Sequence, residues 1–115
     1  MPEPEIQQAI DLFQEAWSAE EKGEMHVAEI CYLRSAFEFE RAGAQHVMDA
    51  ANTLNALAFL RKACGNRDGA IYSAKKSLQM TKKFETQFSD PEVELVRTTA
   101  WDLIDELMDP EGALP

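Results

Sequence analysis

The side chains of this 115-residue chain that could do chemistry include two histidines and two cysteines. His26 and His46 both fall near predicted helix starts, where we expect solvent-facing side chains. Cys31 and Cys64 form neither a CxxC pair nor a disulfide framework. We interpret both as small apolar side chains in a reducing compartment, because a thiol switch would need exposure and a lowered pKa.

Four carboxylates share one face of the helix predicted near the C-terminus, at positions i, i+3, i+4 and i+7. They are Asp102, Asp105, Glu106 and Asp109. Such a row could attract a divalent cation, but carboxylates at this spacing on one helix are more often a solvated face. The sequence has no HExxH, no phosphate-binding glycine loop and no nucleophile motif. We therefore predict a protein that is not an enzyme and holds no metal or cofactor.

The net charge of the chain argues against two classes of binding partner. Eleven basic against 21 acidic residues give a net charge of −10, which argues against nucleic acid or an anionic membrane as a partner. No apolar run approaches the roughly 18–20 residues of a transmembrane helix. The first five residues are acidic and contain proline, unlike the basic and apolar beginning of a signal peptide. We expect a cytoplasmic protein.

The charge is also banded along the chain. Residues 1–60 hold eleven acids and three bases, residues 61–84 hold one acid and seven bases, and residues 85–115 hold nine acids and one base. The central band has a net charge of +6, between two bands of −8. One interpretation is that neighbouring helices alternate in sign and attract one another; the other is a basic strip that receives an acidic ligand segment.

The spacing of apolar residues predicts an all-α chain, because they recur at intervals of three and four. Gly23, Gly43 and Gly65 mark helix ends, and Asp90-Pro91 is a helix start signal. The linkers are short, so consecutive helices should pack antiparallel. The predicted helices cover about 6–22, 24–42, 47–64, 67–88 and 91–108, with residues 1–5 and 109–115 as tails.

A period of 42 residues relates these helices to one another. It joins three small residues, Ala16, Ala58 and Ala100, where two helices would cross with little room between their backbones. The same offset joins Leu12 with Leu54 and Val96, Trp17 with Phe59 and Trp101, Gly23 with Gly65, Ala28 with Ala70, and Ser35 with Ser77. The chain therefore contains an internal repeat.

The repeat resembles a known family. A small residue is followed by glycine seven positions on and by alanine five further on, as Ala16/Gly23/Ala28 and Ala58/Gly65/Ala70. Together with Thr53-Leu54-Asn55-Ala56-Leu57-Ala58, this pattern resembles tetratricopeptide repeats, in particular the 42-residue repeats of kinesin light chains. The resemblance implies a TPR-like domain over 6–108, an α-solenoid fragment of two helix-turn-helix repeats, about 6–43 and 47–88, plus a fifth helix over about 91–108. It implies protein binding but no particular ligand, because repeats of this family bind many unrelated partners.

The resemblance also implies a binding surface. In a tetratricopeptide array the first helix of each pair lines the concave face, and on these helices the positions i, i+3, i+7 and i+10 form one stripe. Aromatic residues at the 42-residue positions would then form a row, and amides beside it could bond to an extended peptide. In the alternative interpretation, the aromatics only fill gaps between adjacent helices. The predicted peptide- or partner-binding residues are Trp17, Asn52, Asn55, Phe59, Lys62, Arg97 and Trp101.

The fifth predicted helix suggests an alternative role. One apolar stripe suffices to close it onto the preceding repeat, yet Trp101, Ile104 and Met108 form a second stripe about 100° round the helix. A contiguous exposed apolar patch marks an interaction surface. The chain could therefore act as a scaffold that binds a protein or peptide of unknown identity, or as a homodimer that takes no peptide ligand.

Overall fold

Five α-helices make up the computed structural model, which describes residues 4–82 and 90–108. Within those two ranges no strand forms, and the predicted all-α fold of antiparallel helix-turn-helix repeats is confirmed. The elements are α1 (Pro4–Glu21), α2 (Met25–Arg41), a 3-10 turn η1 (Ala44–His46), α3 (Val47–Ala63), α4 (Arg67–Thr81) and α5 (Pro91–Met108).

The helix boundaries differ from the prediction at a few points. The first helix already begins at Pro4, inside the tail predicted over 1–5, because the fixed φ of proline suits the first helical position. The turn η1 precedes the third helix and was not predicted. The predicted end of the fourth helix at residue 88 and the predicted tail over 109–115 lie outside the described residues.

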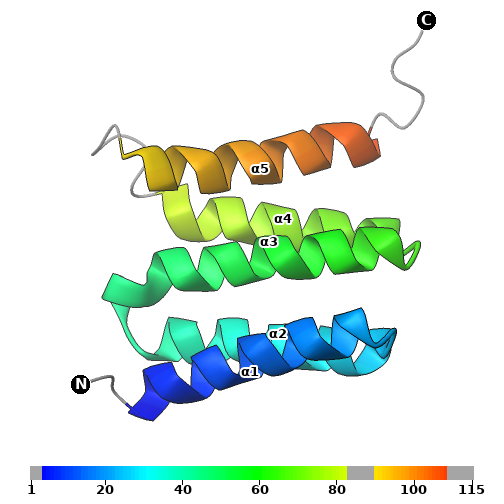
Figure 1. Ribbon diagram of the computed structural model, residues 1–115. Coiled ribbons are helices and arrows are strands. Elements are labelled where there is room, and N and C mark those ends of the chain that lie inside the picture. Colours follow the sequence, from blue (N-terminus) through cyan, green and yellow to red (C-terminus); the bar gives the residue numbers. More distant parts are fainter. Residues whose placement is uncertain (1–3, 83–89, 109–115) are drawn as a thin grey trace, which may run out of the picture.

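The helices form two layers (Figure 1). Each helix packs antiparallel against the next one along the chain, and α3 also contacts α5. The first helices of the repeats, α1 and α3, therefore run in the same direction as α5 and lie on one side of the molecule, while α2 and α4 lie on the other. The side formed by α1, α3 and α5 is called the front face below, and the side formed by α2 and α4 the back face.

The chain reverses at equivalent places in the two repeats. Gly23 and Gly65 have φ values of +80° and +81°, which favour glycine over residues with a Cβ. At each turn, the amide of the residue after the glycine donates a hydrogen bond to the carbonyl oxygen of the residue four positions before the glycine. Glu24 donates to Ala19 at 2.9 Å, and Asn66 donates to Arg61 at 2.8 Å. The same backbone hydrogen bond therefore recurs at both turns, 42 residues apart.

The core repeats with the same period. Ala16, Ala58 and Ala100 are fully buried, as the crossing of closely packed helices requires. Ser35 and Ser77 are fully buried as well. The residues predicted to face the interior on both repeats therefore do so, and this fixes which residues of the same helices must face outward.

Candidate protein-binding face

Three aromatic side chains at equivalent positions lie exposed on the front face. Trp17 on α1, Phe59 on α3 and Trp101 on α5 are 56%, 46% and 51% exposed, and each directly follows a fully buried alanine. Successive helical residues point about 100° apart, so the buried alanines hold the aromatic rings toward solvent. We call these three residues the aromatic row. Half of each ring stays available for contact with another molecule.

A small hollow of about 210 Å³ lies between α1 and α3, and its α1 residues Phe13 and Gln14 are one helical turn before Trp17. Its walls combine the apolar side chains of Ile10, Phe13 and Phe39 with the polar Gln14, Asp49, Asn52 and Thr53. The hollow is smaller than the roughly 300–1,000 Å³ of small-molecule sites, and its size suits a single side chain. The exposed amide of Asn52 therefore lies where the sequence places it, on the front face and beside an apolar recess.

Asn55 does not belong to this surface, and its assignment as a peptide contact is wrong. The side chain is buried, and its Nδ2 atom donates a hydrogen bond to the backbone oxygen of Val96 on α5 at 3.1 Å. The helical spacing places Asn55 on the correct side of α3, but α5 covers that position. The amide serves to hold α5 against α3.

The two predicted cations of the face are engaged within the molecule. The Nζ atom of Lys62 lies 2.6 Å from Oε2 of Glu106, an ion pair between α3 and α5. Arg97 donates through Nη1 to the Leu78 carbonyl oxygen and to Thr81 Oγ1, both at 2.9 Å. These contacts lie at the last turn of α4, where the helix dipole favours a cation. Both side chains therefore fasten α5 to the second repeat.

The proposed self-association stripe on α5 is interrupted, which corrects the sequence prediction. Ile104 is only 4% exposed and packs with Ala58 and Leu78, whereas Trp101 and Met108 are exposed. The reason is that α5 contacts both α3 and α4, so the buried arc of this helix is wider than the single stripe expected. A dimer contact through Ile104 would require α5 to leave its place.

The chemically reactive groups belong to the packing. Burial, and to a smaller extent Glu15, raises the pKa of the Cys31 thiol. Burial also raises the pKa of Tyr32, whose hydroxyl donates to Glu20 at 2.8 Å. The Cys64 thiol is exposed, contrary to the interpretation as an apolar side chain.

The part of the chain that the structure describes contains neither a metal-binding cluster nor a membrane-spanning helix. Within residues 4–82 and 90–108, no three His, Cys, Asp or Glu side chains come together in a way that could hold a metal ion. Over the same ranges, no helix combines the length and apolar character needed to span a bilayer.

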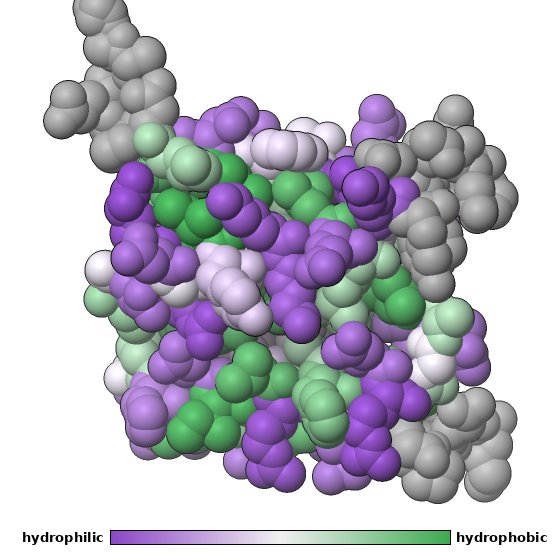
Figure 2. Space-filling model, turned by 180° about the vertical axis from the view of Figure 1, so that it is seen from behind, coloured by the Kyte–Doolittle hydropathy of each residue, from purple (hydrophilic) through white to green (hydrophobic). Residues whose placement is uncertain are grey.

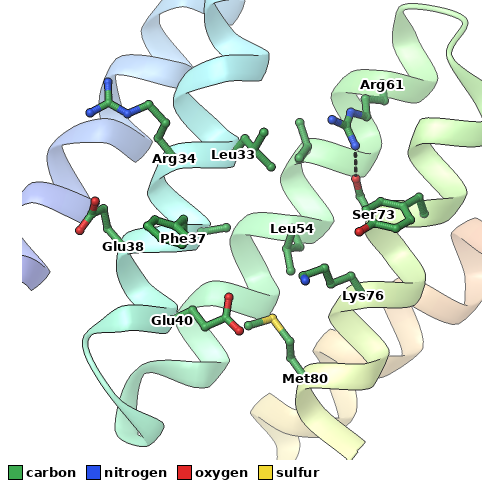
Figure 3. A pocket seen from close by; sticks show the side chains of 13 residues that line it. Leu33, Arg34, Phe37, Glu38, Glu40, Leu54, Arg61, Ser73, Lys76 and Met80 are labelled. Atoms are coloured by element: carbon green, nitrogen blue, oxygen red, sulfur yellow. Dashed lines mark hydrogen bonds between the residues drawn. The ribbon is translucent and has the colours of Figure 1, made fainter.

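Sequence reasoning missed a larger groove on the back face. Figure 3 shows Leu33 and Phe37 from α2 on one side, Leu54 of α3 in the middle, and Lys76 and Met80 from α4 on the other side. The volume of this α2–α4 groove is about 640 Å³. A signal for it was present in the sequence. Apolar residues at 27, 30, 33 and 37 give the second helix an additional stripe besides the one that enters the core.

Comparisons of the chain with protein-family models, curated proteins and solved structures found no match. The functional assignment therefore depends on the arrangement of the side chains.

Proposed function

We propose that this protein is a TPR-like, non-enzymatic interaction module of the cytoplasm that binds a peptide segment or partner protein on its front face. The resemblance to tetratricopeptide repeats is supported by the equivalent glycine turns at Gly23 and Gly65 and by the buried alanines one period apart. An interaction module needs a rigid scaffold that presents contact residues. The two layers of helices supply that scaffold.

The observation that carries the proposal is the exposure of the aromatic row. Exposed Trp and Phe side chains leave large apolar surfaces in water, and three of them recur on neighbouring helices that run in one direction. Tryptophan is enriched among the residues that dominate binding energy in protein interfaces. A partner that covers Trp17, Phe59 and Trp101 would remove this apolar surface from water.

The geometry also indicates how the partner would be recognised. Lys62 and Arg97 already have contacts within the molecule, so an acidic ligand group is not the main determinant expected. An apolar side chain of the partner would enter the hollow between α1 and α3. The amide of Asn52 at its rim would bond to the partner backbone. Recognition would then depend on apolar contacts and not on charge.

Affinity capture from native lysate, compared between variants, tests this proposal. The double variant Trp17→Ala/Trp101→Ala removes two rings of the aromatic row. The control Tyr72→Ala removes a ring that is 63% exposed on the back face. We expect the wild type and the control to capture the same partner. The double variant should capture little or none of it, because two hot-spot rings at on the order of 2 kcal/mol each would weaken binding by roughly a thousandfold.

Fluorescence of the purified chain with the captured partner provides a second measurement. Trp17 and Trp101 are the only tryptophans of the sequence. If the partner has no tryptophan, its binding over the aromatic row should therefore shift the tryptophan emission of this protein. A partner that binds the double variant as tightly as the wild type, with unchanged emission of the wild type, would contradict the proposed site.

A further inference from the structure

The back face carries an apolar stripe that the fold does not use. Val27, Ile30, Leu33 and Phe37 lie along the outer side of α2 and are each between 43% and 56% exposed. The inner side of the same helix is also apolar and is buried through Ala28, Tyr32, Phe39 and others. A surface helix normally has one apolar face, which packs on the core, and a polar face toward solvent, so a second apolar stripe is unusual. We call the four outer residues the α2 ridge.

The α2 ridge borders the α2–α4 groove. Leu33 and Phe37 belong to both, and Leu54 of α3 lies between the two sides of the groove (Figure 3). The buried Leu57 of α3 also lines the groove. A further hollow of about 480 Å³ shares Glu40 and Met80 with the groove and extends it to Val47 and Lys82. The depression therefore follows much of the seam between α2 and α4. α2 itself, with 17 residues, is about 25 Å long.

A ridge and a groove on the same face make that face self-complementary. A two-fold dimer brings the same patch of both copies together, so a ridge must meet a groove in its own partner. Here the ridge is one side of the helix α2, and the groove runs between the helices α2 and α4. Figure 2, which views the back face, shows apolar side chains in its lower part, where α2 lies, and again in its upper part, with hydrophilic side chains between the two.

The two helices that would meet carry small net charges of opposite sign. The ridge helix α2 carries three acidic and two basic side chains. The groove wall α4 carries three basic and one acidic side chain, and Lys82 follows directly after it. The basic band of the sequence therefore forms one wall of an apolar groove, and α2 of a second copy would bring a net charge of −1 against the +2 of α4, so the two helices do not repel each other.

We propose that the back face is the interface of a homodimer, in which the α2 ridge of each copy lies in the α2–α4 groove of the other. The dimer buries Val27, Ile30, Leu33 and Phe37 in both copies. The aromatic row lies on the opposite side of the molecule and stays free in this dimer, so self-association and partner binding do not compete.

Sedimentation velocity of the full chain over a dilution series tests the dimer. We expect the wild type to reach twice the mass of 13.0 kDa as its concentration rises. Phe37→Glu places a charge in the middle of the interface and should weaken the dimer by a factor of about one hundred or more. Leu33→Lys is a second variant with the same expected effect. The matched control is Phe59→Glu, the same substitution at a half-exposed position of the front face.

Circular dichroism establishes that each variant remains folded, as expected for substitutions at half-exposed positions. A wild type that remains monomeric at the highest attainable concentration overturns the proposal. A dimer that tolerates Phe37→Glu and Leu33→Lys overturns it as well. Loss of the dimer in Phe59→Glu, with retention in the two back-face variants, would instead place the interface on the aromatic row.

Discussion

Residues 42 positions apart in α2 and α4 can be compared pair by pair. Two pairs on the inner side are identical, Ala28 with Ala70 and Ser35 with Ser77, and all four residues are fully buried. On the outer side they differ. The exposed Val27, Ile30, Leu33 and Phe37 of α2 correspond to Gly69, Tyr72, Lys75 and Gln79 of α4.

This difference shows that the inner positions of α2 are determined by packing in the core, whereas its outer positions are not. These two inner positions agree because the helices cross there with little room, which admits only small side chains. At other inner positions the repeats differ, since the buried Tyr32 and Phe39 of α2 correspond to Ala74 and Thr81 of α4. The outer positions do not contribute to that packing, and α4 shows that largely polar residues suffice there. The apolar outer side of α2 therefore requires another explanation, and a second copy of the chain supplies it.

The largest expected effect tests the inner positions. Ala58→Trp inserts a large ring at a fully buried crossing, and we expect a loss of about 3 kcal/mol or more in the free energy of unfolding. The matched control is Phe59→Trp at the next position, whose 42-residue equivalents are already tryptophan. That variant should stay within about 0.5 kcal/mol of the wild type. Urea unfolding measures both. Equal stability of the two variants would show that the repeat register is wrong.

The second expected effect is a pH dependence of stability that arises from the first repeat and not from the second. Cys31 and Tyr32 have raised pKa values in the folded protein, above the ordinary 9.0 and 10.0, whereas their equivalents Ser73 and Ala74 do not titrate. Because the folded state holds these protons more tightly, their contribution to stability is fully present below pH 9 and is lost as the pH rises. The expected slope is at most about 1.4 kcal/mol per pH unit for each group.

Unfolding free energies between pH 8 and pH 11 measure this loss. The double variant Cys31→Ala/Tyr32→Phe should lose less stability over that range than the wild type. Tyr72→Phe removes an exposed phenol and serves as the control, since its alkaline loss should equal that of the wild type. If the double variant and the wild type have the same slope, the alkaline loss arises from other groups.

Local helix geometry made part of the fold and of the candidate site predictable from the sequence, and tertiary packing determined the rest. The period of 42 residues placed the glycine turns, the buried alanines and the row of aromatic residues, because these positions depend on local helix geometry. It left open whether the aromatic rings face solvent or fill gaps between helices, and the structure shows them exposed. It could not place Asn55 or Ile104, because α5 covers both from a direction that depends on tertiary packing. The α2 ridge was visible as a second apolar stripe. Which of two stripes faces the core depends on the neighbouring helices.

The smallest effect concerns two residues that share their identity, burial and repeat position. Ser35 Oγ donates to the Ala9 carbonyl oxygen at 2.7 Å, whereas Ser77 Oγ, equally buried, has no hydrogen-bond partner among the described residues. Ser35→Ala should cost about 1 kcal/mol, the usual net value of a buried hydrogen bond. Ser77→Ala removes a hydroxyl whose loss of hydration nothing offsets, so it should be neutral or stabilise the fold by up to about 1 kcal/mol. Thermal and urea unfolding of the two variants side by side provide the measurement. Equal costs at both positions would mean that Ser77 has a bonding partner and that the two repeats are alike inside.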